Sequence, residues 1–575
     1  MSRGVMALKL IPPWKFPRTG LQYFLIVVLL LGIFFRFVNL DQKVYWGDET
    51  ISSARIAGYS ADEIFQSLYT GREVSVEQIQ KYQNVNPEKD VTDTLKVLAQ
   101  EAPNHPPLYY IIARFWEQWF GTSVGVKRTL PAVISLLVFP SIYWLCLELF
   151  ESSLTGWVAL AVVAVSPIHL LYAQEVREYS LWSVTVLLSS ASLLWAMRVQ
   201  TKASWRISAV SLAIALYSHL FSGLVVLGQA IYVLVIERMH WSKRLKNYLL
   251  SAVAGFSIFV PWLVIFIANE RHASKKWAWV VQNLPTGQFY QRWVTNLVRG
   301  FFDVQIGTDD PFNVPLDFTH PKTYLMVPIL LLVGYSMYFL WRNTPARIWL
   351  FVLMIVAFST LPMALPDLIS GGMRSTIPRY QLPSYLGIQL AVSYLLAAKL
   401  SDVTSGIWQQ KLWRGITVSL ISCGVISCVL ILQADTWWNK YGDYYSTEPV
   451  RLINQSPSPV VLSESNYVRI LSLSHQLDPK VRLQLVDSPL LDPQVRLRLL
   501  ENPNEVAEMP KEKLPELSGN FSDVFLIEHA PPPSLLLSGL QKHKNYKFEL
   551  MYQNKISFDN RSTLLWRLVN GKDEG

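Results

Sequence analysis

Long runs of apolar residues, separated by short polar stretches, make up most of the chain. The first run, Leu21–Leu40, is apolar except for Arg36 and Asn39, and roughly 20 such residues are enough to cross a bilayer. The later runs are Leu130–Leu149, Leu154–Leu171, Tyr179–Met197, Trp205–Tyr217, Leu220–Ile236, Leu249–Ala268, Tyr324–Leu340, Ile348–Leu365, Tyr380–Ala398 and Leu412–Leu432. This pattern predicts an α-helical polytopic membrane protein with about eleven transmembrane helices.

One further apolar segment, Pro106–Phe120, is short and contains Arg114 and Glu117. Such a mixture is typical of an interfacial helix. Basic residues lie before Leu21 and in the clusters Arg198/Lys202/Arg206, Arg238/Lys243/Arg244/Lys246, Arg342/Arg347 and Lys399/Lys411/Arg414. If Pro106–Phe120 does not cross, all these clusters lie on one side, which the positive-inside rule assigns to the cytoplasm. We therefore predict a cytoplasmic N-terminus and an extracytoplasmic loop 41–129 with interfacial helices.

The pattern changes at about Gln433, where the predicted membrane domain 1–432 ends. Short strand-like runs then alternate with helical stretches such as Tyr467–Gln476 and Ser534–Lys542. The strand-like runs are Val460–Leu462, Val481–Val486, Asp523–Ile527, Phe548–Tyr552 and Ser562–Val569. Residues 433–575 are therefore predicted to form a small α/β domain outside the membrane, on the same side as loop 41–129.

Composition supports an integral membrane protein and excludes some other classes. The 575 residues are 51% hydrophobic, with a mean hydropathy of +0.24. The net charge of +9 lies in short loops, as membrane topology requires, so we predict no nucleic-acid partner. The cysteines, Cys146, Cys423 and Cys428, all lie in apolar runs, so no disulfide framework is indicated.

Two acids, Asp48 and Glu49, follow directly after the first predicted span. They are compatible with the start of a helix, with Asp48 as the N-cap, Glu49 in the first turn and Ile51–Ala57 as helix. A partly desolvated carboxylate at a membrane edge is also suited to act as a general base toward an attacking hydroxyl. The two interpretations are compatible, because a helix start also fixes the carboxylate in place.

A second charged group, Glu175, Arg177 and Glu178, lies in a short turn between two predicted spans. Charges in a solvated loop are ordinary, but an arginine between two acids beside lipid is typical of a binding element. In the first loop, His105 precedes two prolines that favour a helix start. His105 is either a donor to a phosphate or a cap for the turn.

Arg374, Arg379 and Tyr380 precede the tenth predicted span. Arginine suits a phosphate at the membrane surface, because its fork donates two hydrogen bonds, although Arg and Tyr are also ordinary interfacial anchors. Several aromatic residues of the long outer loop are either anchors of the same kind or surfaces that stack on sugar rings: Trp277, Trp279, Phe289, Tyr290 and Trp293. Nucleotide-binding loops and zinc motifs are missing from the sequence, so the chemistry is expected to use a donor already carried in the membrane.

Five short motifs carry a resemblance to a known family. They are Tyr45-Trp-Gly-Asp-Glu-Thr50, Asn104-His-Pro-Pro-Leu-Tyr-Tyr110, Arg128-Thr-Leu-Pro131, Ser166-Pro167 with Tyr172-Ala-Gln-Glu-Val-Arg-Glu-Tyr179, and Arg379-Tyr380-x-x-Pro383. Over roughly residues 20 to 400, this order resembles the polyprenyl-phosphate-dependent glycosyltransferases of the GT-C membrane fold. That family includes the dolichyl-phosphate-mannose protein mannosyltransferases and the lipid A aminoarabinose transferase (glycosyltransferase family 39).

The resemblance implies a membrane glycosyltransferase that moves a sugar from a polyprenyl-phosphate donor to a glycan, lipid or protein acceptor on the extracytoplasmic side of the plasma or inner membrane. It implies that Asp48 is the catalytic acid, with Glu49 beside it, and that Glu178 or Glu175 supplies the second acidic position. His105 and Arg379 are implied donor-phosphate contacts, to which we add Arg177, Tyr380 and Arg374. No metal ligands are assigned, but some relatives use a divalent metal ion, and the paired acids could hold one. The alternatives are a transporter or flippase for lipid-linked glycans, an oligosaccharide ligase, and a catalytically silent scaffold.

Overall fold

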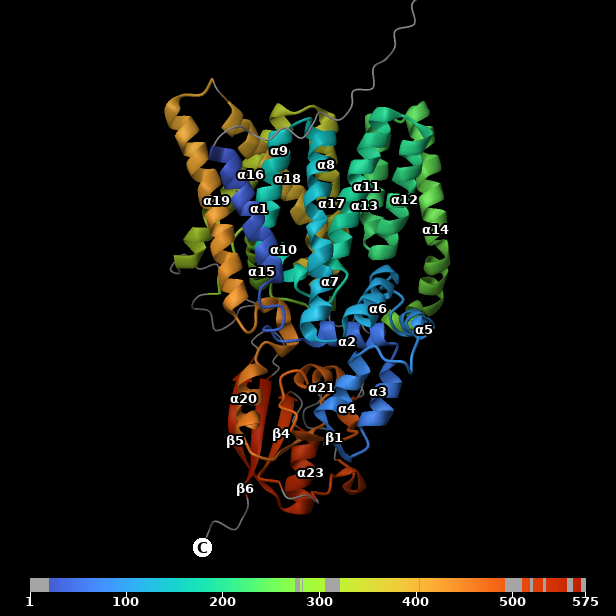
Figure 1. Cartoon of the computed structure of the whole chain (residues 1–575), viewed down its shortest axis with the longest axis vertical. Coiled ribbons are helices and arrows are strands. Elements are labelled where there is room, and N and C mark those ends of the chain that lie inside the picture. Colours follow the sequence, from blue (N-terminus) through green and yellow to red (C-terminus); the bar gives the residue numbers. More distant parts are fainter. Residues whose placement is uncertain are drawn as a thin grey trace, which may run out of the picture.

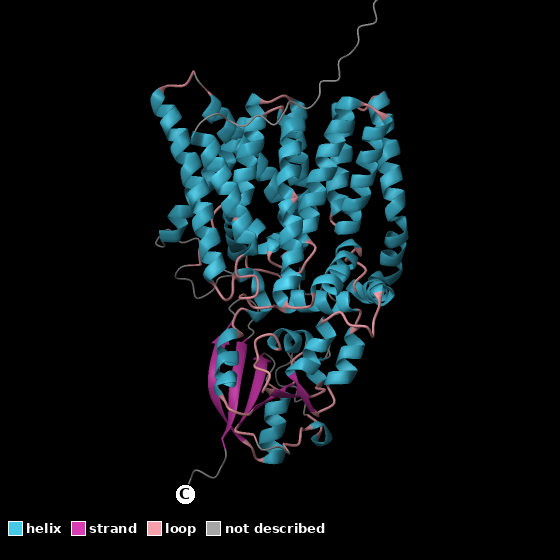
Figure 2. Ribbon diagram, in the orientation of Figure 1, coloured by secondary structure: helices cyan, strands magenta, loops and turns pink. Residues whose placement is uncertain are grey.

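The computed structural model describes residues 20–274, 280–281, 283–305, 321–402, 404–491, 509–517, 521–530, 534–555 and 562–569. A bundle of helices lies above a smaller part that carries a β-sheet (Figures 1 and 2). The bundle helices are α1 (Gly20–Phe37), α7 (Val124–Leu136), α8 (Val138–Phe150), α9 (Ser153–Ala164), α10 (Pro167–Ala173), α11 (Tyr179–Val199), α12 (Lys202–Ser218), α13 (Ser222–Ile236), α14 (Lys243–Ser274), α16 (Pro321–Asn343), α17 (Ala346–Ser370), α18 (Leu382–Ser401) and α19 (Ile407–Gln433).

Every apolar run predicted to cross the membrane is helical in the structure. By length and composition alone, six helices of the described chain are able to span a membrane, or up to seven if the bent pair α9–α10 counts as one span. The described chain is therefore a polytopic membrane fold, and the number of eleven spans stays a prediction.

The predicted run Leu154–Leu171 is not one straight helix, because α9 and α10 meet at an angle of 63°. Pro167 begins α10 and has no N–H with which to continue α9. The buried guanidinium of Arg36 donates to the carbonyls of Ala164 (2.8 Å) and Val163 (3.3 Å) at the end of α9. Arg36, the charged residue of the first span, thus satisfies the end of a broken helix.

Gly32 brings α1 close to α9. A Cβ added at Gly32 would lie 2.6 Å from both the Cβ and the carbonyl oxygen of Ala164. We expect Gly32→Ala to destabilise the protein by about 1–3 kcal/mol, because the helices must move apart. Gly334→Ala is the matched control, since its Cβ would meet nothing within 4 Å. Thermal denaturation of both variants in detergent checks this prediction, and equal melting temperatures would contradict it.

The first loop folds into short helices, and none of them is among the described helices long and apolar enough to cross a membrane. They are α2 (Gly47–Ala57), α3 (Ala61–Leu68), α4 (Val76–Gln80), η1 (Lys81–Gln83), α5 (Val91–Glu101) and α6 (Leu108–Phe120). The 13 residues of α6 span only about 20 Å, less than the hydrocarbon core of a bilayer. Arg114 of α6 is buried and donates to the carbonyls of Ile56 and Lys89. Arg114 therefore ties α6 to the end of α2 and the start of α5.

The smaller part contains one six-stranded sheet with the order β1-β3-β2-β4-β6-β5 (magenta in Figure 2). Its elements are β1 (Glu73–Ser75), α20 (Thr447–Gln455), β2 (Pro459–Ser463), α21 (Tyr467–Leu473), β3 (Arg482–Leu485), η6 (Pro489–Leu491), η7 (Lys511–Lys513), β4 (Asp523–Ala530), α23 (Leu535–Lys544), β5 (Lys547–Lys555) and β6 (Ser562–Val569). β3, β2 and β4 are parallel, whereas β1, β5 and β6 pair antiparallel. All five strand-like runs of residues 433–575 are strands.

The sheet is not built from the C-terminal region alone, because β1 comes from the first loop. Glu73, Val74 and Ser75 pair with β3, and buried apolar residues of α3 pack with those of α21 and β3. The sequence pattern did not predict this, since three residues are too few for a periodicity. The first loop and the C-terminal region therefore form one folded unit below the bundle.

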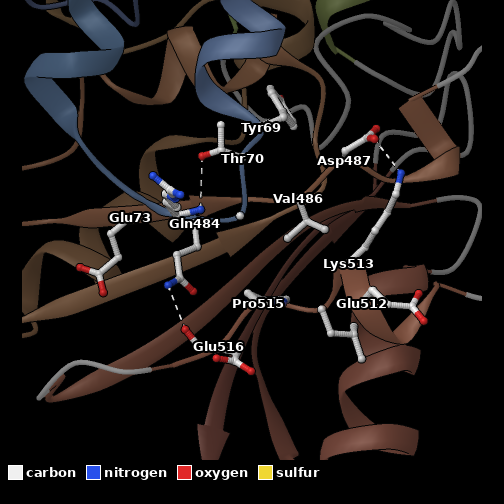
Figure 3. A pocket seen from close by; sticks show the side chains of 13 residues that line it. Tyr69, Thr70, Glu73, Gln484, Val486, Asp487, Glu512, Lys513, Pro515 and Glu516 are labelled. Atoms are coloured by element: carbon white, nitrogen blue, oxygen red, sulfur yellow. Dashed lines mark hydrogen bonds and ion pairs between the residues drawn. The ribbon is translucent and has the colours of Figure 1, made fainter.

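A cleft of about 610 Å³ lies where these two segments meet (Figure 3). Residues 69–73 line one side, and residues from β3 onward line the other. Lys513 closes one end through an ion pair with Asp487 at 2.6 Å, and Gln484 donates to the carbonyl of Glu516 at 3.3 Å. None of the predicted site residues lines this cleft.

Candidate active site

Helix α2, which carries Asp48 and Glu49, lies at the lower end of the bundle, above α21 (Figure 1). Asp48, in the first turn of α2, lies 3.4 Å from the guanidinium of Arg379. Arg379 belongs to η4 (Pro378–Gln381), and its guanidinium also lies over the ring of Trp46 at 5.6 Å. The side chain of Asp48 is 26% exposed, whereas those of Glu49, Glu175 and Glu178 are at most 1% exposed. Asp48 is thus the accessible carboxylate among the four predicted acids.

Glu49 is fully buried and held on every side. Arg128 of α7 donates to both carboxylate oxygens, at 2.8 Å and 2.7 Å, and Lys440 lies 2.9 Å from Oε2. The backbone N–H of Val176 donates to Oε1 at 3.1 Å. Burial raises the pKa of Glu49, but Arg128 and Lys440 together lower that pKa to about 2. Glu49 is therefore an ionised structural anchor between α2, α7 and the turn 174–178.

Glu175 shares the same lysine. Lys440 lies 3.1 Å from Glu175 Oε1, and the amide of Asn439 donates to that oxygen at 2.5 Å. Burial raises the pKa of Glu175 above its ordinary value, although Lys440 acts in the opposite direction. Oε2 of Glu175 is buried without a hydrogen-bond partner among the described residues.

Glu178 is the centre of a second cluster. His105 lies 2.8 Å from Oε1 through its Nδ1, Arg177 lies 3.4 Å from the same oxygen, and the hydroxyl of Tyr110 donates to Oε2 at 3.4 Å. Burial raises the pKa of Glu178, but the charge of Arg177 and the hydrogen bond from His105 bring that pKa well below its ordinary value. Arg177 also donates to Ser52 of α2 at 3.1 Å. The turn and the helix that carries Asp48 are thereby joined.

The geometry of His105 defines its role at neutral pH. Burial lowers the pKa of His105 to about 4, against the opposite effect of Glu178, so the ring is neutral at pH 7. An ionised carboxylate only accepts hydrogen bonds, so the single ring hydrogen is on Nδ1. Nε2 is then an acceptor, and His105 can donate to a phosphate only after a second protonation.

This assignment predicts different effects for two amide substitutions of His105. The side-chain nitrogen of Asn is the same number of bonds from Cα as Nδ1, whereas that of Gln corresponds to Nε2. We expect His105→Asn to retain about ten- to a hundredfold more activity at pH 7 than His105→Gln, because only Asn keeps the donor to Glu178. Rates measured with purified variants check this. A better rate in His105→Gln would place the essential nitrogen at Nε2.

The other predicted phosphate contacts lie in different surroundings. Tyr380 lies beside Arg379, whose guanidinium is 5.4 Å from its ring. Arg374 is in η3 (Arg374–Thr376), where it pairs with Asp367 at 2.8 Å and donates to the carbonyl of Gly371. The structure therefore places Tyr380 against Arg379, the partner of Asp48, and joins Arg374 to the end of α17.

Three of the five predicted aromatic residues of the long outer loop lie on a described helix. Phe289, Tyr290 and Trp293 belong to α15 (Thr286–Arg299), and the indole of Trp293 donates to Ser375 at 3.1 Å. Trp277 and Trp279 lie outside the described residues. Stacking on a sugar ring stays a prediction for these side chains.

The start of α2 differs from the sequence expectation. The N-cap is Trp46, whose side chain makes no capping hydrogen bond, and Asp48 lies inside the first turn. The backbone N–H of Gly47 donates instead to the carboxylate of Asp443 at 2.8 Å. The expected N-cap role of Asp48 is therefore wrong: a distant acid caps the helix, and the side chain of Asp48 is left to Arg379.

Three functional candidates were missed in the sequence: Lys440, Asp443 and the pairing role of Arg128. Lys440 and Asp443 belong to η5 (Trp438–Asp443), which directly follows the last apolar run on the predicted active side. Their position after the last apolar run was the signal in the sequence that could have identified them. Charged residues beside tryptophans at the exit of a span are candidates for the same face as Asp48.

The buried acids do not fit a divalent metal ion. Both oxygens of Glu49 are occupied by Arg128 and Lys440, and the ammonium group of Lys440 is the cation between Glu49 and Glu175. Within the described part of the chain, no group of three His, Cys, Asp or Glu side chains could hold a metal ion. A second cation beside Lys440 would be repelled, so no step is assigned to a metal.

Together the fold and the site define a polytopic membrane protein in which acids and arginines pair beside the start of α2. A family model described as dolichyl-phosphate-mannose-protein mannosyltransferase matches residues 104–265, which include His105, Arg128 and the turn 174–178. No curated protein has a significant sequence match to the chain.

Solved structures are similar in fold at low sequence identity. ArnT from Cupriavidus metallidurans bound to undecaprenyl phosphate has a TM-score of 0.52 and 13% identity, covering 96% of this chain and 99% of that chain. Its apo state has a TM-score of 0.49 and 11% identity, covering 95% and 98%. Arabinofuranosyltransferase AftD from Mycobacteria has a TM-score of 0.47 and 11% identity, covering 96% of this chain and 40% of that chain. The likeness to undecaprenyl-phosphate-bound ArnT shows the fold, and with the family match it confirms the predicted resemblance to polyprenyl-phosphate-dependent GT-C glycosyltransferases.

Proposed function

We propose that the protein transfers a sugar from a polyprenyl-phosphate donor to an acceptor hydroxyl, with Asp48 as the general base. One observation carries this proposal: the accessible carboxylate of Asp48 lies 3.4 Å from the guanidinium of Arg379. A base and a phosphate-binding cation side by side are what this transfer requires, because the acceptor loses a proton near the point where the donor gains charge.

The reaction is a direct displacement with inversion at the anomeric carbon. Asp48 takes the proton of the acceptor hydroxyl while the hydroxyl oxygen forms a bond to the anomeric carbon. The bond between that carbon and the phosphate oxygen breaks on the opposite face, and polyprenyl phosphate leaves with the electron pair. Arg379 neutralises the developing phosphate charge through its forked donors. Buried Glu49, Glu175 and Glu178 fix the surrounding cations and the backbone of α2.

We place this site on the extracytoplasmic side of the membrane. The connections α11–α12, α13–α14, α16–α17 and α18–α19 lie at the end of the bundle away from the sheet (Figure 1). These connections carry the basic clusters that the positive-inside rule assigns to the cytoplasm.

Transfer of a radiolabelled sugar from short-chain polyprenyl-phosphate monosaccharides, with purified protein in detergent, tests this function. Donor hydrolysis in the absence of acceptor is measured in parallel, because the acceptor class is not known. Turnover of one or more monophosphate donors is expected. Turnover of pyrophosphate-linked oligosaccharides alone would favour a ligase, and movement of such lipids across vesicle membranes without turnover would favour a flippase.

A further inference from the structure

The connector between the last bundle helix and the sheet is anchored to α15 and the segment that follows it. At the start of η5, the indole groups of Trp437 and Trp438 both donate to one carboxylate oxygen of Asp303, at 2.8 Å and 2.6 Å. The guanidinium of Arg299 lies over the Trp438 ring at 4.2 Å. These contacts bury the connector and fix Lys440, which is 1% exposed, at the acid cluster.

Lys440 connects two acids that would otherwise repel each other. It lies 2.9 Å from Glu49 and 3.1 Å from Glu175. Glu49 also forms an ion pair with Arg128. For Glu175, Lys440 is the cation within ion-pair distance in the described part of the chain. Two buried carboxylates this close to the same ammonium group need a fixed cation between them.

Lys440 is one of four cations that pair with the predicted acids. The carboxylates Asp48, Glu49, Glu175 and Glu178 face the cations Arg379, Arg128, Lys440 and Arg177. Removing Lys440 takes one positive charge from this set before any donor arrives. A donor phosphate brings further negative charge, so this lysine favours its approach.

Asp443, from the same connector, determines where Asp48 lies. Its carboxylate accepts from the N–H of Gly47 at 2.8 Å, and its other oxygen pairs with Arg469 of α21 at 3.4 Å. Asp443 therefore caps α2 and joins that helix to the sheet-bearing part. Asp48 is the next residue after Gly47, so a shift of this cap shifts the base.

We infer that Lys440 and Asp443 are positioning residues of the transferase, Lys440 for the charge that admits the donor phosphate and Asp443 for the first turn of α2 that carries Asp48. The inference rests on the proposed function and extends the site to the connector between bundle and sheet. The contacts of the two residues give them separable effects, one on donor binding and one on the chemical step.

Donor saturation kinetics of the full-length protein in detergent, with folding checked by thermal denaturation, test this inference. Lys440→Met should raise KM for the phosphate donor and lower kcat/KM about a hundredfold, and Lys440→Arg should recover most of the loss by restoring the charge. Asp443→Leu should lower kcat about tenfold with KM unchanged, whereas Asp443→Asn keeps a capping oxygen and should stay near wild type. The matched control is Lys480→Met, because Lys480 is exposed and pairs with Asp478.

Several outcomes would overturn the inference. One is a folded Lys440→Met protein with the wild-type KM and kcat, and another is a loss of activity that only follows the loss of folded protein. If Lys440→Met does not fold, the two Asp443 variants decide, and wild-type kcat in Asp443→Leu overturns the assignment. A wild-type protein that turns over no phosphate donor would instead refute the proposed function, and this inference with it.

Discussion

Replacing Asp48 by asparagine is expected to lower sugar transfer about 10²–10⁴-fold, the contribution that general-base catalysis typically makes. Asparagine keeps the size of the side chain and can still accept a hydrogen bond from Arg379, which lies 3.4 Å away. It cannot take the acceptor proton. Because Asp48 is partly exposed and does not cap α2, the variant should fold and insert normally. The change is therefore expected in kcat, with the melting temperature close to that of the wild type.

Asp41→Asn is the matched control, since Asp41 is exposed in the same loop and carries no proposed role. Both variants are compared with the wild type for transfer of labelled sugar and for donor hydrolysis. Asp48→Asn that is folded, inserted and as active as Asp41→Asn would remove Asp48 as the base. His105 would then be the next candidate base, through the lone pair on Nε2. Glu178 orients the His105 ring by its contact with Nδ1.

The sequence predicted those features that follow from local periodicity. Each apolar run became helical, because nearly every side chain in a span contacts lipid or another helix and the pattern is strong. The strand-like runs after Gln433 became strands for the same kind of reason. Charge distribution also indicated that α6 does not cross, in agreement with its length.

Features that depend on distant contacts were not predictable in this way. Lys440 and Glu49 are 391 positions apart, and Gly47 and its cap Asp443 are separated by 396 positions. Nothing in the local pattern around Gly47 indicates that its helix is capped from the C-terminal region. The break between α9 and α10 was similarly hidden, since Pro167 begins a second helix and Arg36, from another helix, donates to the carbonyls at the end of α9. Tertiary contacts of this kind override local preference wherever a buried charge finds its partner across the fold.

Removing the guanidinium of Arg128 is expected to cause the largest loss of stability. Arg128 is 1% exposed, and besides its two hydrogen bonds to Glu49 it donates to the carbonyls of Leu40, Lys43 and Val44 at 2.8–2.9 Å. In Arg128→Met these carbonyls lose a donor, and Glu49 keeps Lys440 as its cation. Breaking a buried pair of this kind costs about 3–5 kcal/mol. Thermal denaturation in detergent, followed by tryptophan fluorescence, measures the difference.

The pH dependence of this loss separates the ion pair from simple packing. The pKa of Glu49 is lowered to about 2 from its ordinary value of 4.5, so its stabilising contribution is fully present above about pH 4.5 and is lost as the pH falls through about 2. The stability lost in Arg128→Met should therefore be constant between about pH 6 and 8. It should become smaller in acid, because Glu49 is protonated at a higher pH in the variant than in the wild type. Arg347→Met is the control, because Arg347 pairs with Glu151 while their side chains are 54% and 65% exposed, and such a pair contributes about 0–1 kcal/mol. If Arg128→Met loses no more stability than the control, Lys440 alone suffices to hold Glu49. If its loss of stability does not change in acid, the loss comes from packing of the arginine side chain.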